Sequence, residues 1–444
     1  MIKRIAAGFL ALVMCCLPGC EKAAPQQTTE PQCDHQYGEW IKRKLPTCSK
    51  EGWDERFCSL CNASDTRTVA TVAHTPDQYN VCRKCFFVEY DPDADVVELG
   101  IVSNRNYGPV SIANTAWDIK VWNGQVYRGA GDYNENAGKV PILSFDIATN
   151  RWQFHGDMPD QAIHSYEVIN GTLYAPGIDP TGSWDAGNFY YLKDGKWKTM
   201  RTIPNGIHNF DMIEFDGKIF AGVGTEDADD TVAVSTDEGA SWTYVPLYKD
   251  GQPLDTSGYK WSRTYEFTRY NDQLYALISF QLNIGSSYMV FRYEDGKMVW
   301  LSDQVSRLIS GSSVSRKYWG GEFEFDGACY LTLSSLYAIR DFSDQDSYEK
   351  IEMPNDERVA DAFLKDGVIY VLAFQQDRKT LEYTITIYKS TTGKTGSFTP
   401  VQTFTRTVAP CSFDTDGTYF YVGMGYNNND KAKSGMILRV KPNA

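Results

Sequence analysis

A β-hairpin pattern recurs seven times along residues 95–444, and this repeat constrains the fold more than any other feature of the chain. In each copy, alternating residues flank a two-residue turn of the Asn-Gly or Asp-Gly kind, and an aromatic residue follows shortly after the turn. Alternation with period two on both sides of such a turn is the signal of a hairpin. The copies read WDIKVWNGQVYRGAG, SYEVINGTLYAPG, DMIEFDGKIFAGVG, YEFTRYNDQLYALIS, GEFEFDGACYLTLS, DAFLKDGVIYVLA and CSFDTDGTYFYVGMG, with turns that begin at Asn123, Asn170, Asp216, Asn271, Asp326, Asp366 and Asp416.

A second hairpin follows each of the first six copies and carries an aromatic residue just past its turn. Two hairpins make a four-stranded sheet, and a run of such sheets is typical of a β-propeller. The sequence therefore predicts an all-β fold with a seven-bladed propeller over residues 95–444, although six or eight blades would also fit the spacing. The aromatic residues are Trp152, Trp197, Trp242, Trp300, Tyr348 and Phe398.

The two ends of this repeat region complement each other. The seventh copy has its hairpin (411–425) and one further strand (435–440), so it lacks a fourth strand. The segment DVVELGIV (95–102) precedes the first copy and is a strand without a blade. We expect this N-terminal strand to complete the last blade, because pairing hides an edge that would otherwise be exposed.

One second hairpin has a more specific signature. The residues STDEGASW, from Ser235 to Trp242, resemble the Asp-box of sialidase-like propellers. The resemblance implies that Asp237 holds the turn while Trp242 packs between blades, which is a structural role on the outer rim. The stretch from Asp146 to Trp152 is a looser version, closer to kelch-type repeats, although their Gly-Gly doublets are absent.

The first strand of each propeller blade lines the central channel, which places candidate site residues by register. At the position five residues before the turn, four of the seven copies have a carboxylate. A glycoside hydrolase needs two carboxylates at a set separation. The candidate catalytic residues are Asp118, Asp211, Glu266 and Asp361. The candidate ligand-binding residues lie in the lead-in segments just before the inner strands and are His164, His208, Arg263, Tyr265, Trp319 and Arg358.

A polar pocket with aromatic walls suits a sugar. The sequence thus predicts a protein that binds a glycan or a protein partner through the face formed by these lead-in segments, which we call the lead-in face. The other explanation is that the channel is polar only because it holds water. The alternative is a glycoside hydrolase in the same pocket. A sialidase-like site would use Arg263, Arg358, Asp118 and Tyr265, but Arg105 lies in SNRNYGP rather than in the arginine motif of that family.

Cysteine and histidine residues gather in a separate module at residues 33–90. Eight nitrogen and sulfur ligands can form two tetrahedral zinc sites, and the segment has too few aliphatic residues to fold on apolar burial alone. We expect a small zinc-ribbon-like module with structural zinc. One plausible set is Cys33, His35, Cys58 and Cys61, and the other is Cys48, His74, Cys82 and Cys85.

The same pattern resembles a short cysteine/histidine repeat in secreted proteins of anaerobic bacteria, although Asn62 replaces the glycine of that repeat. Two alternatives stay open. Three disulfides would suit an exported protein, but they would leave both histidines without a role. A redox-active Cys58/Cys61 pair lacks the strand and helix that surround thioredoxin-like motifs.

The first twenty residues have the features of a lipoprotein signal peptide. A positive start precedes an apolar run that is too short to span a membrane comfortably, and the run ends in LPGC. This ending resembles the lipobox of bacterial lipoproteins, which implies cleavage before Cys20 and lipid attachment to it; the alternative is an ordinary cleaved signal. Residues 21–32 have the composition of a flexible tether.

These features predict an exported monomer, anchored by lipid to the outer side of a bacterial membrane, at the cell surface or in the periplasm. The formal net charge of −14 argues against a nucleic-acid partner, since phosphate binding needs a basic surface.

Overall fold

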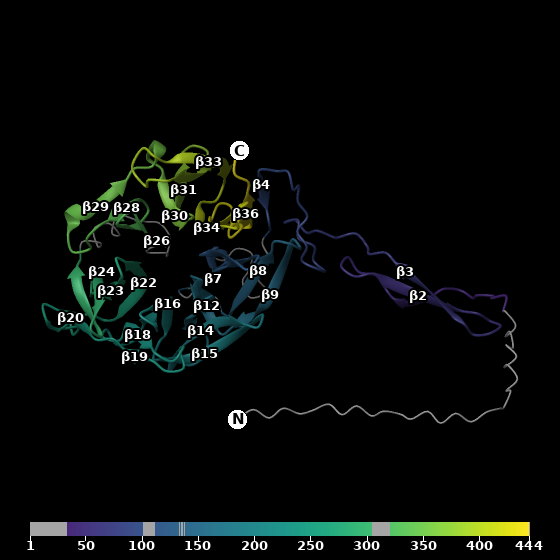
Figure 1. Cartoon of the computed structure of the whole chain (residues 1–444), viewed down its shortest axis with the longest axis horizontal. Coiled ribbons are helices and arrows are strands. Elements are labelled where there is room, and N and C mark those ends of the chain that lie inside the picture. Colours follow the sequence, from purple (N-terminus) through teal and green to yellow (C-terminus); the bar gives the residue numbers. More distant parts are fainter. Residues whose placement is uncertain are drawn as a thin grey trace, which may run out of the picture. The chain divides into compact units, whose positions relative to one another are not determined.

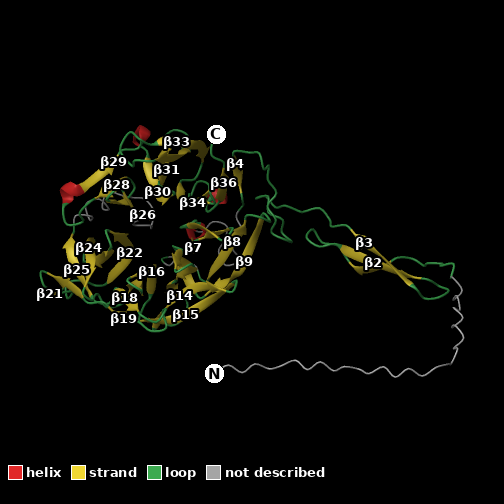
Figure 2. Ribbon diagram, in the orientation of Figure 1, coloured by secondary structure: helices red, strands yellow, loops and turns green. Residues whose placement is uncertain are grey.

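The computed structural model describes residues 33–100, 112–132, 134, 136, 138–303 and 320–443. This part of the chain divides into two compact units after Ala73. Strands dominate both units, and the helical segments are single turns (Figure 2). These turns are η1 (Ile112–Asn114), η2 (Gln345–Ser347), η3 (Pro354–Asp356) and η4 (Lys431–Lys433). Within the described ranges no helix has the length and apolar character that crossing a membrane requires.

The first unit contains a three-stranded antiparallel sheet of β1 (Ile41–Lys44), β2 (Gly52–Phe57) and β3 (Ser64–Val69). β1 is exposed along its whole length, so little apolar surface is buried here. Charged side chains cover the sheet instead: Arg67 pairs with Asp54 at 2.8 Å, and the Arg56 guanidinium lies 4.3 Å from the centre of the Trp40 ring. Such contacts are weak when they are exposed, so this unit needs a further source of stability.

The second unit is a ring of seven four-stranded antiparallel blades (Figure 1), as the repeat predicts. Blade 1 consists of β5 (Ile119–Trp122), β6 (Gln125–Arg128), β8 (Val140–Asp146) and β9 (Arg151–Met158), and blade 2 of β11 (Glu167–Ile169), β12 (Thr172–Pro176), β14 (Ala186–Lys193) and β15 (Lys196–Pro204). Blade 3 consists of β16 (His208–Phe215), β17 (Lys218–Gly224), β18 (Val232–Ser235) and β19 (Thr243–Tyr244), and blade 4 of β22 (Ser262–Tyr270), β23 (Gln273–Gln281), β24 (Ser286–Glu294) and β25 (Lys297–Ser302). Blade 5 consists of β26 (Gly320–Phe325), β27 (Ala328–Thr332), β28 (Leu336–Ile339) and β29 (Tyr348–Ile351), and blade 6 of β30 (Arg358–Lys365), β31 (Val368–Gln376), β32 (Tyr383–Ser390) and β33 (Thr399–Arg406). Blade 7 consists of β34 (Pro410–Thr415), β35 (Phe420–Met424), β36 (Ile437–Val440) and β4 (Val96–Glu98).

The ring closes through its N-terminal strand, as the sequence predicts. β4 pairs antiparallel with β36, and Val97 lies opposite Arg439. The N-terminal strand is therefore the outer strand of blade 7, which is otherwise built from the C-terminal end of the chain.

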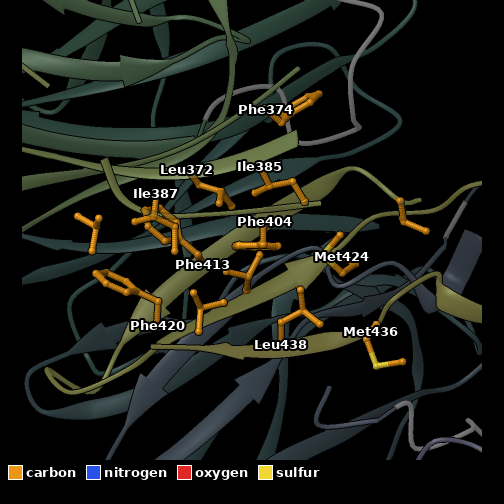
Figure 3. Close-up of a cluster of buried hydrophobic side chains, with 14 residues drawn as sticks. Leu372, Phe374, Ile385, Ile387, Phe404, Phe413, Phe420, Met424, Met436 and Leu438 are labelled. Atoms are coloured by element: carbon orange, nitrogen blue, oxygen red, sulfur yellow. The ribbon is translucent and has the colours of Figure 1, made fainter. Parts of the chain in front are cut away.

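The apolar core is divided into layers between neighbouring blades. Figure 3 shows the layer between blades 6 and 7, where Leu372 and Ile387 face Phe413 and Leu438. Similar buried clusters occupy the other six interfaces of the ring. Each blade thus depends on both neighbours for its buried surface.

Short connector strands add a feature that the repeat does not predict. β7 (Ala130–Gly131), β10 (Asp160–Ile163) and β13 (Ile178–Pro180) continue the sheet of β16 in the order β7-β10-β13-β16. A small hairpin of β20 (Leu247–Lys249) and β21 (Gln252–Pro253) extends blade 4, with β20 parallel to β25. The connectors join the lead-in ends of blades 1 to 3 by main-chain hydrogen bonds.

Residues 74–90 pack on the propeller rather than on the three-stranded sheet. The N–H of Val88 donates to the carbonyl of Asn150 at 2.8 Å, and the N–H of Trp152 donates to the carbonyl of Phe86 at 3.1 Å. Val81 and Val88 are buried in the same cluster as Trp152. This segment is therefore part of the second unit, whereas the sequence pattern groups it with residues 33–73.

Candidate functional site

A cavity of about 510 Å³ lies along the central channel of the propeller. Every blade contributes side chains to its wall, through the inner strand or the segment that leads into it. The lining residues are Asp118, Ile119, Lys120, Val121, His164, Ser165, Glu167, Phe210, Tyr265, Glu266, Glu322, Phe323, Asp361, Ala362, Phe363, Leu364, Lys365, Phe413, Asp414 and Thr415.

Three of the four candidate catalytic carboxylates bind the main chain of the next blade. Each aspartate uses one carboxylate oxygen to accept from an N–H of the neighbouring blade, on its inner strand or, for Tyr166, just before it. This bond satisfies a buried donor and ties two blades together, which is a structural role. The pairs are Asp118 with Tyr166 at 2.8 Å, Asp211 with Phe267 at 2.7 Å and Asp361 with Phe413 at 3.1 Å.

A bulge on the inner strand accompanies these positions. The pairing shifts by one residue between Asn209 and Asp211 in blade 3, and between Val359 and Asp361 in blade 6. Blades 4, 5 and 7 have shifts at the equivalent place. A bulge bends the strand and redirects the side chain beside it, which suits the inter-blade bonds of Asp211 and Asp361. Asp118 makes its bond from a position just before β5, where the pairing of β5 with β6 runs without a shift.

The cavity is strongly acidic. Six carboxylates line it, against the two lysines Lys120 and Lys365. Burial lowers the pKa of Lys120, but the surrounding carboxylates, Glu167 first among them, raise it by more, so its pKa lies above the usual value. Lys120 and Glu167 were not among the predicted site residues. They stand two residues after Asp118 and Ser165, and the period-two alternation of a strand could have placed them in the same channel.

The six predicted ligand-binding residues do not form one group. His164 and Tyr265 line the cavity. Nη2 of Arg263 lies 3.0 Å from Nε2 of His208, and this pair sits beside the cavity, with the Arg263 guanidinium 5.9 Å from the centre of the Phe210 ring.

Burial and the charge of Arg263 lower the pKa of His208 to about 3. The imidazole is therefore neutral at ordinary pH and can accept from the guanidinium. Arg358 is exposed and borders a separate cavity of about 80 Å³. Trp319 lies outside the described residues.

The turn with the Asp-box signature is held by its own side chains. Asp237 accepts from the N–H of Ser241 at 2.9 Å and from its hydroxyl at 2.6 Å. Trp242 is 8% exposed and donates from Nε1 to Oγ1 of Thr202 at 3.1 Å, across the interface with blade 2. Asp237 thus stabilises the turn, and Trp242 joins the two blades.

The first predicted metal set is assembled within the first unit. The ligand atoms of Cys33, His35, Cys58 and Cys61 all lie within 4.8 Å of one another. Burial raises the pKa of the Cys58 thiol, but hydrogen bonds from His35 and from main-chain N–H groups outweigh it and bring the pKa to about 5. Four nitrogen and sulfur ligands, one of them a ready thiolate, match the donor set of structural zinc.

Three residues of the second set lie together in the propeller unit. The ligand atoms of His74, Cys82 and Cys85 are within 4.8 Å of one another, and the His74 ring stacks on Phe87. Cys48 belongs to the first unit, and its place in this set stays a prediction. In the described part of the chain no two cysteines are joined by a disulfide bond in this structure.

The chain matches no family model, and no similar protein was found among curated proteins. Similar solved structures include PorZ, a surface component of the type-IX secretion system of Porphyromonas gingivalis (TM-score 0.47, 11% identity, 88% of this chain and 55% of that one). They also include YCF48 bound to D1 peptide (TM-score 0.45, 11% identity, 80% of this chain and 99% of that one). A third is the propeller domain of the Trilobed protease from Pyrococcus furiosus (TM-score 0.42, 12% identity, 72% of this chain and 91% of that one). These values are low, so the fold assignment rests on the strand order of the chain itself.

Proposed function

We propose that this chain is an exported, lipid-anchored binding protein that takes a positively charged group of a protein partner into its central channel. The acidic cavity carries the proposal: six carboxylates against two lysines in one concave site favour a cationic ligand. His164, just before β11, and Tyr265, in β22, would contact the partner at the lead-in end. A glycan is the alternative ligand, because carboxylates also accept from hydroxyl groups.

Binding is favoured over glycoside hydrolysis by the roles of the aspartates. A hydrolase needs one carboxylate as acid and another as base or nucleophile. Asp118, Asp211 and Asp361 each accept from a main-chain N–H of the next blade. In each case the carboxylate is turned toward the neighbouring blade and holds a main-chain donor there, which is a structural role.

The test is a binding screen of the full chain against an array of lysine- and arginine-containing peptides and an array of neutral glycans. The double substitution Glu266→Gln and Glu322→Gln removes two charges from the cavity wall, and Asp295→Asn, in an exposed turn of blade 4, is the control. We expect peptide binding that weakens with salt and at least tenfold in the double variant. Salt-insensitive binding of neutral glycans, or turnover of a glycoside, would contradict the proposal.

The lipid anchor is tested separately at Cys20. We expect Cys20→Ser to release the protein from the membrane fraction, because the acyl chains on that cysteine supply the membrane affinity. Cys16→Ser, in the part of the leader that cleavage would discard, should leave the protein on the membrane. Retention of the Cys20 variant would contradict the anchor.

A further inference from the structure

Five buried polar side chains extend from neighbouring strands of blades 2 and 3 and of the connector before blade 2. They extend from four neighbouring strands, since β10, β13 and β16 are hydrogen-bonded in that order and β14 contacts both β13 and β16. We call them the oxygen cluster: Asp160 (0% exposed), Gln161 (7%), Asp179 (5%), Asn188 (1%) and Asn209 (0%).

Hydrogen bonds fix the orientation of each amide in the oxygen cluster. Nδ2 of Asn188 donates to Oδ2 of Asp160 at 2.9 Å, and Nδ2 of Asn209 donates to the main-chain carbonyl of Asn188 at 3.3 Å. Nε2 of Gln161 donates to Oδ2 of Asp179 at 2.8 Å. Since every NH₂ group faces an acceptor, the amide oxygens cannot exchange places with the nitrogens.

The remaining oxygen of every member has no hydrogen-bond partner. These atoms are Oδ1 of Asp160, Oε1 of Gln161, Oδ1 of Asp179, Oδ1 of Asn188 and Oδ1 of Asn209. Buried polar atoms in folded proteins are nearly always paired, so an unpaired one calls for an explanation. Five such atoms on four neighbouring strands, all of them acceptors, point to a bound positive group rather than to scattered packing faults.

We propose that the oxygen cluster binds one divalent cation of the calcium type, which pins β10, β13, β14 and β16 together on the lead-in side of blades 2 and 3. Calcium takes six to eight oxygen ligands from carboxylates, amide carbonyls and water in flexible geometry. The donor set contains no nitrogen or sulfur, so it does not suit zinc.

The charge balance supports a dication over a water molecule. Two carboxylates are buried here, and each already uses one oxygen to accept a hydrogen bond. A dication supplies positive charge next to both carboxylates, whereas a water molecule supplies none.

Gly177 shows how closely the main chain approaches the cluster. A Cβ atom at this position would lie 2.5 Å from Oδ2 of Asp160 and 3.0 Å from the carbonyl of Asn188. Only glycine leaves room for the Asp160 carboxylate here, so the strands are packed around that carboxylate.

The test uses the full chain after treatment with a calcium chelator. Calorimetric titration with Ca²⁺ should show one equivalent bound, and Ca²⁺ should raise the melting temperature of the propeller. Asp160→Asn and Asp179→Asn should each weaken Ca²⁺ binding at least tenfold. Without Ca²⁺ both variants should melt no lower than the wild type, because they remove a buried charge while keeping an acceptor oxygen.

Asp295→Asn changes the same charge in an exposed turn and should leave both measurements unchanged. The proposal is overturned if millimolar Ca²⁺ neither binds nor shifts the melting temperature of the wild type. It is equally overturned if binding persists in both Asp160→Asn and Asp179→Asn, since the ion would then lie elsewhere.

Discussion

At the scale of single residues, the acidic side chains near the channel of the propeller have different structural roles. Asp211 faces the next blade and satisfies a main-chain donor there, whereas Glu266 in the following blade lines the cavity. Both were selected from the sequence by the same count from a turn. Counting predicts which strand and which end a residue occupies, but it does not predict which way the side chain turns, since these two residues differ although the same register shift stands beside both.

The inter-blade aspartates give a direct prediction. Asp211→Ala should lower the free energy of unfolding by about 1–3 kcal/mol, because the buried N–H of Phe267 loses its acceptor. Asp211→Asn keeps one oxygen for that donor and should cost less. Urea unfolding of both variants provides the measurement. Equal losses in the two variants would show that the hydrogen bond is not the source of the effect.

Trp242 gives a second prediction at this scale. Trp242→Ala should cost about 3–5 kcal/mol, because a large buried ring is lost from the interface between blades 2 and 3. Trp242→Phe keeps the ring contact with Phe189 and loses only the Nε1 hydrogen bonds, so it should cost less. Neither variant should alter ligand preference in the peptide screen; a changed preference would place this turn in the binding site.

The Asp237 carboxylate predicts a pH dependence. Hydrogen bonds from Ser241, and then from Ser235, hold its pKa at about 2, below the usual 3.8. A lowered pKa in the folded state adds stability above the unfolded pKa, and this stability is lost as the pH falls through 2. Wild type and Asp237→Asn should therefore differ in melting temperature at pH 6 and converge near pH 2. A difference that is constant over this range would contradict the argument.

At the scale of elements, the strongest local signals give the most reliable predictions. In the first six inner hairpins both turn residues have positive φ, for example 47° at Asn123 and 73° at Gly124, and Asn-Gly and Asp-Gly pairs favour this conformation. In the seventh, Asp416 instead accepts from the N–H groups of Thr418 and Tyr419 at 2.7 Å each, in a longer loop. β7, β10 and β13 have no such turn signal. They exist because neighbouring blades bring them together, which one sequence does not show.

The closing strand β4 allows a test of how the ring is held. Val97→Asp places a charge in the buried cluster that Val97 shares with Leu99 and Ile437. We expect a loss of at least about 3 kcal/mol across the whole propeller, because an unpaired buried charge is costly and the ring depends on this strand. Val168→Asp, on a half-exposed valine of β11, is the matched control. Similar melting of the two variants would mean that β4 does not contribute to closure.

At the scale of the whole chain, the two units rely on different sources of stability. The propeller buries an apolar layer at each of its seven interfaces, and that layering follows from the repeat. The three-stranded sheet buries little, so cysteine and histidine spacing was the better guide to its fold. The same spacing could not show that residues 74–90 join the propeller, because the bonds of Phe86 and Val88 to blade 1 are made with residues far along the chain.

Metal removal should separate these two sources of stability. A zinc chelator should unfold β1 to β3 while the propeller keeps its structure, because the folding energy of a small metal module is its metal-binding energy. Hydrogen exchange provides the measurement: residues 41–69 should lose protection, whereas Val88 should keep it through its bond to Asn150. Cys33→Ser with Cys61→Ser should reproduce the effect without chelator, and Cys329→Ala, in the propeller core, should not. Protected β1 to β3 strands in metal-free protein, together with disulfides found by mass spectrometry, would show that oxidation holds this unit instead.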